Sequence, residues 1–330
     1  MTLPNSSQET LRKRHSIIKD CRYFFEEKHD FVEVITPTLV ANPGLEPHIE
    51  YFETNFVDNM GTRPTETLFL PTSPEYHLKR ALAMGLDRIF EIKSSFRNGE
   101  FSPRHRPEFL MLEWYRHPGS YKDIGQDTQD LFAFLAEKHA LNPQVWTKTR
   151  HLSVCDAFLE YCSIDLEKLL REGNQNDLAL LAIEKGIHGV NASASFDEAF
   201  HFLIVDKIEK ALSPDEITFL WDYPMEFATL ARQHPSKPYL AERFEVYVGP
   251  LELGNAFGEL TDQKAQRLRC QKDLEERQKN YPNASLPPLD EKFLKSLDDL
   301  NEAGGIAIGL ERLIMGLLNL KNLSDLRVFE

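Results

Sequence analysis

The chain has 330 residues, of which 42% are hydrophobic and 27% charged, a balance typical of a globular protein and not of a disordered or fibrous chain. Its 38 Lys and Arg residues against 52 Asp and Glu residues give a net charge of −14, which disfavours sequence-blind binding to nucleic acid or to anionic membranes. The N-terminus is polar and no apolar stretch is long enough to span a bilayer, so a cytoplasmic location is expected.

The predicted elements mix helices and strands without a regular alternation. An amphipathic helix over residues 9–29 leads into an alternating strand over 31–37 that ends in proline. The further predicted strands cover residues 51–57, 68–70, 88–96, 109–115, 218–220, 243–257 and 304–309. The further predicted helices cover residues 76–84, 121–139, 153–161, 166–186, 196–212, 262–280 and 311–318, with Leu268 and Leu274 facing inward in the helix over 262–280. This order favours an α+β fold over a doubly wound parallel sheet.

The densest group of charges lies on the hairpin predicted between residues 88 and 116. Six Arg and Lys residues face four Glu residues there, a local excess of positive charge in an acidic chain. Guanidinium groups match the geometry of phosphate, so this hairpin is a candidate anion site. The alternative explanation, that these charges belong to an ordinary solvent-exposed hairpin, stays open.

A second group of candidate residues lies on the strands predicted over 243–257. A turn at Gly249 and Pro250 pairs Tyr247 with Glu252 and places Glu245 diagonally opposite Glu252. Diagonal residues lie about 7–8 Å apart, within reach of one shared ion for long side chains. Two carboxylates without a paired cation indicate Mg²⁺, although two solvent-facing glutamates on an edge hairpin would give the same pattern.

The third group is a glycine-rich strand, 304–309, that runs into a helix. Its small residues indicate that another group approaches the backbone closely, and Arg312 adds positive charge near the start of the helix. Close packing of strand and helix with Arg312 at the surface is the alternative. The common phosphate-binding glycine loops are absent from the sequence, so any nucleotide would have to be bound by a different structural element.

Together these groups resemble the three signature motifs of class II aminoacyl-tRNA synthetases. The helix and strand that end at Pro37 resemble motif 1, which forms the dimer, residues 96–109 resemble motif 2, and residues 309–312 resemble motif 3. Within the class, Ser73-Pro74-Glu75 and the segments 111–115 and 252–259 are similar to the lysine-specific branch.

The resemblance implies ATP and Mg²⁺ as cosubstrate and cofactor, and a role for each matching residue. Arg97 is implied to bind the α-phosphate and the substrate carboxylate, and Arg312 the γ-phosphate, which makes these two the catalytic candidates. The other implied nucleotide-binding residues are Asn98, Glu100, His105, Phe109, Glu252, Leu253 and Gly309, and the implied Mg²⁺ ligands are Glu245 and Glu252. The implied amino-acid pocket consists of Ser73, Pro74, Glu75, Glu113, Tyr115, Asn255, Glu259 and Ala307. A diamino acid needs such carboxylates, because a buried cation requires paired anions.

Two features separate the chain from a complete lysyl-tRNA synthetase. About ten residues precede the motif 1 region, whereas an anticodon-binding domain needs on the order of 100, so we expect a single catalytic domain over residues 1–330. Ala307 stands where those synthetases have glycine. Both features resemble the stand-alone paralogues that activate (R)-β-lysine and transfer it to a lysine of elongation factor P; by this resemblance a homodimer is expected, and tRNA is not expected as a partner.

Other readings of the resemblance stay open. They are a truncated lysyl-tRNA synthetase that uses tRNA or another acceptor, an amide synthetase that uses ammonia, and a non-catalytic regulatory paralogue that binds an amino acid. The chain departs from the family pattern at Gly99, where the motif has Glu, at Arg106, where it has Asn, and at Glu311, where it has Asp.

Overall fold

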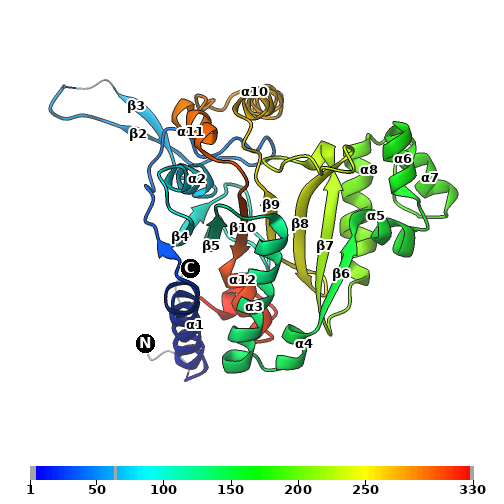
Figure 1. Ribbon diagram of the computed structural model, residues 1–330, viewed down its shortest axis with the longest axis horizontal. Helices are drawn as coiled ribbons and strands as arrows, with labels where there is room; N and C mark the ends of the chain where they lie inside the picture. The colour runs from blue at the N-terminus through cyan, green and yellow to red at the C-terminus, as the bar shows by residue number, and fades with distance from the viewer. Residues whose placement is uncertain (1–4, 63–64, 328–330) are drawn as a thin grey trace.

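A mixed eight-stranded sheet forms the centre of the computed structural model, which describes residues 5–62 and 65–327. The strand order is β1-β4-β5-β10-β9-β8-β7-β6, and neighbouring strands are antiparallel except for the two outermost pairs, β1 with β4 and β6 with β7 (Figure 1). The strands are β1 (Val32–Glu33), β4 (Arg88–Phe96), β5 (Glu108–Arg116), β6 (Thr149–Ser153), β7 (Ile217–Pro224), β8 (Leu240–Val248), β9 (Leu251–Gly258) and β10 (Gly304–Gly309). A separate hairpin is formed by β2 (Glu53–Phe56) and β3 (Glu66–Phe69). The predicted α+β class is therefore confirmed.

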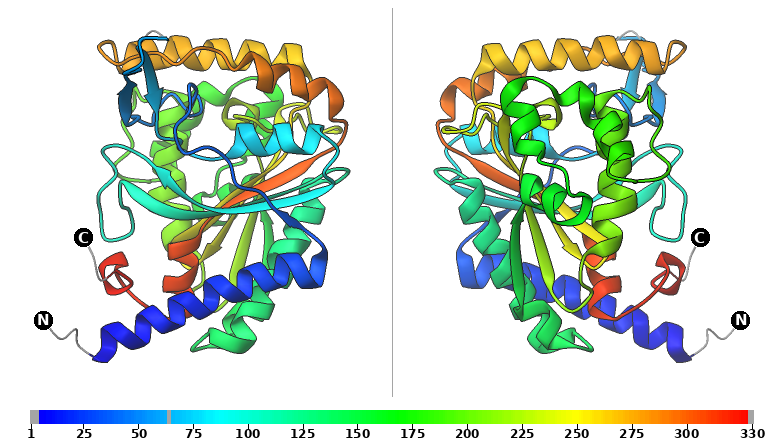
Figure 2. Two further views of the ribbon diagram at one scale, coloured as in Figure 1. Left: turned by 90° about the vertical axis from the view of Figure 1, so that its left-hand side faces the viewer. Right: turned by 90° about the vertical axis from the view of Figure 1, so that its right-hand side faces the viewer.

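One face of this sheet carries the main hydrophobic core. Alternate strand residues such as Leu112, Trp114, Ile306 and Ile308 are buried there against helices. The helices on this face are α1 (Asn5–Tyr23), α3 (Tyr121–His139), α4 (Pro143–Thr147) and α12 (Leu310–Leu317); Figure 2 shows α1 crossing below the sheet. Burial of this apolar face fixes the opposite face as the one whose side chains remain available for a site.

The opposite face is covered only at its two ends. At one end lie α2 (Glu75–Ala83), α10 (Gln263–Asn280) and α11 (Glu291–Ser296). At the other end a helical insertion between β6 and β7 packs its own core on β7 and β8 (Figure 1). Its helices are α5 (Val154–Ala157), α6 (Leu166–Glu172), α7 (Leu178–Glu184), α8 (Phe196–Leu203) and α9 (Glu209–Ala211).

Three sequence expectations need correction. The strand predicted over 31–37 is only two residues long, because it pairs at the sheet edge and Ile35 is 91% exposed. The single helix predicted over 166–186 is two helices, since Gly173 takes a left-handed conformation that ends α6. Leu268 is exposed, whereas Leu274 packs inward as predicted, on the face of α10 that also carries Cys270 and Arg277. Among the described residues, no helix has the length and apolar character that a membrane span requires.

Candidate active site

A cavity of about 880 Å³ opens on the uncovered face of the sheet, between the α2 and α10 end and the helical insertion. It brings together most of the residues selected from the sequence. Those that line it are Ser73, Glu75, Arg97, Glu100, His105, Phe109, Tyr115, Glu252, Leu253, Asn255, Ala307, Gly309 and Arg312. The remaining candidates, which do not line it, are Pro74, Asn98, Glu113, Glu245 and Glu259.

The hairpin of β4 and β5 supplies the first arginine of the cavity. The guanidinium carbon of Arg97 lies 5.3 Å from the centre of the Phe109 ring, and Nη1 lies 3.8 Å from Oε1 of Glu100. Burial lowers the pKa of His105, and the nearby guanidinium groups of Arg312 and Arg97 lower it further. The imidazole is therefore neutral near pH 7, and the local field favours an anion.

The three departures from the family pattern have clear structural settings. Gly99 has a φ of +80°, a conformation that strains any residue with a side chain. Arg106 donates to the backbone carbonyls of Ser102 and His105 and so braces its own loop. Glu311 is buried and joins three distant segments: it accepts from Arg327 at 2.8 Å and from the backbone N–H of Leu110 at 3.3 Å, and it pairs with Arg14 at 3.5 Å.

A bulge in β9 brings Glu252 to the cavity. The sheet register pairs Val246 with Gly254 and Tyr247 with Glu252, which leaves Leu253 as the extra residue. In a regular strand Glu252 and Asn255, three residues apart, would face opposite sides; the bulge puts both on the cavity side. The predicted pairing of Tyr247 with Glu252 is confirmed, but the bulge was not anticipated.

The expected pair of unpaired carboxylates is not what the structure shows. Glu245 is half-buried, pairs with Arg243 at 2.6 Å, and accepts hydrogen bonds from the hydroxyls of Tyr223 and Tyr247. Glu252 is partly exposed and pairs with Arg312 at 3.2 Å. The described residues contain no group of three side chains suited to hold a metal ion. A Mg²⁺ site made by both carboxylates would require Glu245 to leave Arg243 and the two tyrosine hydroxyls. The assignment of Mg²⁺ to Glu245 and Glu252 therefore stays a prediction.

A buried carboxyl without a cation lies beneath the cavity. Glu113 accepts hydrogen bonds from Ser73 at 2.6 Å and from Tyr115 at 3.0 Å, and its side chain is fully buried. Burial raises the pKa of Glu113 to about 8, and the nearby charge of Glu75 raises it in the same direction. An isolated buried carboxylate is costly, so this position is suited to a group that gains a cationic partner from a ligand.

Next to it lies an ion triad that the sequence reading missed. Nζ of Lys79 lies 2.6 Å from Oε1 of Glu75, one helical turn earlier, and it also pairs with Glu259. Burial lowers the pKa of Lys79, but the charges of Glu259 and Glu75 outweigh it and raise the value, so the side chain is an ammonium ion. The available signal was a lysine within the apolar stripe of a short helix, four residues after Glu75. We call Glu75, Glu113, Glu259 and Lys79 the acidic pocket.

Two buried acceptors at the acidic pocket lack donors among the described residues. Oδ1 of Asn255 and Oε1 of Glu259 have no hydrogen-bond partner. Both residues belong to the cavity-facing row of β9 and its end, and a side chain at Gly305 would collide with Tyr115 and Glu259. Buried acceptors are normally satisfied, so these two indicate a ligand that brings N–H donors.

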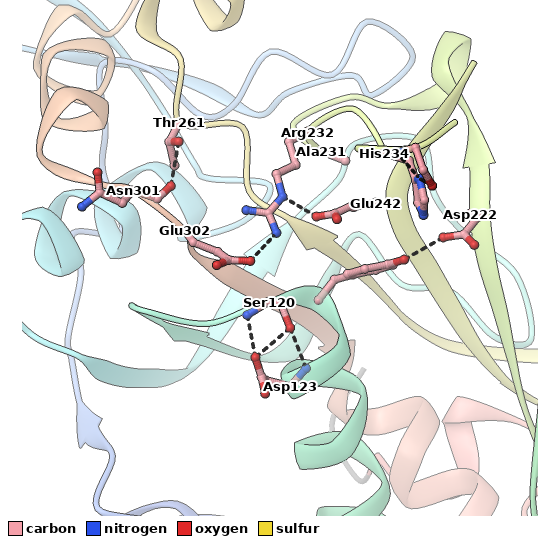
Figure 3. Close-up of polar contacts among 12 residues, drawn as sticks. Ser120, Asp123, Asp222, Ala231, Arg232, His234, Glu242, Thr261, Asn301 and Glu302 are labelled. Carbon is pink, nitrogen blue, oxygen red and sulfur yellow. Dashed lines mark hydrogen bonds and ion pairs between the residues drawn. The ribbon is translucent and has the colours of Figure 1, made fainter. Parts of the chain in front are cut away.

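Arg232 fixes the chain behind Glu259. Figure 3 shows its guanidinium between Glu242 and Glu302, and the second of these pairs is 2.9 Å long. Its backbone N–H donates to the carbonyl of Gly258 at 2.7 Å, directly before Glu259. The clamp joins β8, the end of β9 and the segment before β10, and so it holds in place the part of the chain that carries Glu259.

The helical insertion and the loop after β1 supply walls that the sequence did not predict. Asp197 and His201 of α8 line the cavity, as does Glu46 in the loop after β1, and Glu226 lines it from the turn after β7. Burial raises the pKa of Glu46, and the positive charge of Arg97 partly offsets this rise. These residues come from segments without a recognisable motif, so only the packing of the insertion against the sheet reveals them.

The fold and the site define a class. A model of the class II tRNA synthetases of the D, K and N type matches residues 2–330, and the chain belongs to this family. The curated relatives include the "Elongation factor P--(R)-beta-lysine ligase" of Proteus mirabilis, 35% identical over 99% of this chain and 96% of that protein. Proteins with the same name from Buchnera aphidicola and Haemophilus influenzae are each 34% identical, over 98% and 99% of this chain and 96% of their own length.

Proposed function

We propose that the protein is an ATP-dependent ligase that activates (R)-β-lysine and transfers it to the ε-amino group of a lysine on elongation factor P. The observation that carries this proposal is that Arg97 and Arg312 line one cavity together with Glu75 of the acidic pocket. The arginines suit a triphosphate, and the acidic pocket suits an amino acid with two ammonium groups. The names of the relatives at about 35% identity supply the acceptor.

The first step is attack of the substrate carboxylate on the α-phosphorus of ATP. A bond forms from the carboxylate oxygen to phosphorus, and the bond to pyrophosphate breaks, which gives an aminoacyl adenylate. We assign Arg97 to the carboxylate and α-phosphate and Arg312 to the γ-phosphate, with Phe109 stacked on the adenine. These side chains act by neutralising charge and by holding the reactants in line, so no protein nucleophile is needed.

The second step is attack of the acceptor amine on the carbonyl of the adenylate. An amide forms, AMP leaves, and the amine loses a proton. Mg²⁺ supplies charge neutralisation for the triphosphate when bound, and Glu252 is the accessible carboxylate on that side of the cavity. We further propose that the chain acts as one catalytic domain and as a homodimer through the motif 1 region.

Isotope exchange between pyrophosphate and ATP tests activation, and intact mass of elongation factor P tests transfer. Exchange that depends on (R)-β-lysine, together with a mass increase of one β-lysyl group, is the expected result. Exchange without a mass increase would refute the acceptor, and acylation of tRNA in its place would favour a truncated synthetase. Amino-acid binding without any exchange would favour a regulatory paralogue.

A further inference from the structure

Lys79 lies behind the acidic pocket and does not line the cavity. Its side chain has no exposed surface, and its Nζ contacts Glu75, which lines the cavity, and Glu259, which does not. The stem packs near the ring of Phe293 of α11, 5.9 Å from Nζ to the ring centre. A substrate in the cavity therefore meets Glu75 directly and does not meet the lysine itself.

The contacts of Lys79 occupy only one oxygen of each carboxylate. Oε1 of Glu75 and Oε2 of Glu259 pair with the ammonium group. Oε1 of Glu259 has no hydrogen-bond partner among the described residues. Lys79 thus holds both carboxylates in place while it leaves acceptor capacity for another cation.

The charges of the acidic pocket match a particular class of ligand. Three carboxylates against one ammonium leave an excess of two negative charges when all are ionised. Burial raises the pKa of Glu113 and of Glu259 to about 8 in the free protein, and a bound ammonium group would favour the ionised form of both. A diamino acid brings two ammonium groups, and its own carboxylate is assigned to Arg97. Without Lys79 the excess would be three, and the buried charge of Glu259 would lose its only ion pair among the described residues.

We infer that Lys79 is a positioning residue that orients Glu75 and Glu259 and sets the charge of the pocket to fit a substrate with two ammonium groups. This inference rests on the proposed activation of a diamino acid. It assigns specificity to an internal cation that never touches the substrate, which differs from the roles of the cavity-lining residues.

The test compares Lys79→Met and Lys79→Ala with the intact enzyme in the pyrophosphate exchange assay with (R)-β-lysine. Removing one partner of a buried ion pair should raise KM for the diamino acid about tenfold or more, while KM for ATP changes less than about twofold. Lys138→Met is the control, because Lys138 pairs with Asp20 between α3 and α1 and does not line the cavity. It should leave KM for the diamino acid unchanged.

Chemical rescue separates charge from packing. Propylammonium replaces the atoms that Lys79→Ala removes, and it should restore the low KM, whereas 1-propanol of the same size should not. If Lys79→Met does not fold, Lys79→Ala can be purified in the presence of propylammonium, and its KM for the diamino acid can then be measured with and without this compound. Equal rescue by propanol, or a wild-type KM in Lys79→Met, would overturn the inference alone. If no diamino acid supports pyrophosphate exchange by the intact enzyme, the proposed function itself fails, and the role of Lys79 fails with it.

Discussion

Nη1 of Arg312, in the first turn of α12, lies 3.2 Å from Oε2 of Glu252 at the start of β9, although 60 residues separate them. The same nitrogen lies 3.2 Å from the backbone carbonyl oxygen of Glu252. This contact places the proposed γ-phosphate ligand beside the carboxylate that faces the same space. A triphosphate and its counterion would replace the protein's own ion pair with stronger charge-assisted contacts.

Arg97 and Arg312, the two arginines assigned to phosphate, should be essential for activation. Arg97→Ala and Arg312→Ala each remove a guanidinium assigned to developing phosphate charge, so pyrophosphate exchange should fall by about 10²-fold or more. Arg267→Ala is the control, since Arg267 forms an exposed ion pair with Glu291. Exchange that survives either cavity substitution would show that the phosphate assignment is wrong.

Glu252 should govern the requirement for Mg²⁺. Glu252→Gln keeps the size of the side chain but removes its charge, so the Mg²⁺ concentration for half-maximal exchange should rise about tenfold or more. Glu291→Gln changes an exposed carboxylate far from the cavity and should have no effect. Glu245→Gln tests the second predicted Mg²⁺ ligand directly. If this variant needs the same Mg²⁺ concentration as the intact enzyme, Glu245 does not bind Mg²⁺ and serves only as the ion-pair partner of Arg243.

Ala307 should contribute to the choice between α- and β-amino acids. It lies opposite Glu113 on β5 and Asn255 on β9, so its methyl group stands on the cavity wall among the pocket residues. Ala307→Gly should shift the ratio of kcat/KM toward α-lysine, measured by exchange with both substrates. Ala256→Gly, on the buried face of β9, should lower stability by about 1–2 kcal/mol without changing that ratio.

Binding of the diamino acid should tighten as pH rises toward 8. Glu113 has a raised pKa of about 8 against an ordinary 4.5, so the folded protein keeps a proton there that the unfolded chain has lost. Stability contributed by this protonated group is therefore present at low pH and lost as pH rises through about 8. A bound ammonium group should offset that loss, so the diamino acid should raise Tm more at about pH 9 than at about pH 6. The groups that face Glu113 are Glu75, Glu91, Lys93, Ser73 and Tyr115.

Calorimetric titration in buffers of different ionisation enthalpy gives a second measure. Proton release on binding near pH 7 is expected for the intact protein and should disappear in Glu113→Gln. A Tm increment that is independent of pH, with no proton release, would show that Glu113 is already ionised in the free protein.

The sequence by itself determined the local features of this protein. Apolar periodicity located α3 and β4 to the residue, and the turn at Gly249 and Pro250 fixed the pairing of Tyr247 with Glu252. The resemblance to the family motifs selected Arg97 and Arg312, both of which line the cavity, and their assignment to phosphate stays a prediction. These features depend on neighbours along the chain, which a single sequence displays directly.

Only the tertiary structure decided how charges pair across the sheet. The bulge at Leu253 turns Glu252 into the cavity, Arg243 pairs with Glu245, and Lys79 pairs with Glu259 at a separation of 180 residues. Such contacts bring together β-strands and helices whose order in space is set by burial of the opposite, apolar face of the sheet. The energy of a buried ion depends on its partners in three dimensions, and no periodicity in the sequence records which partners those are.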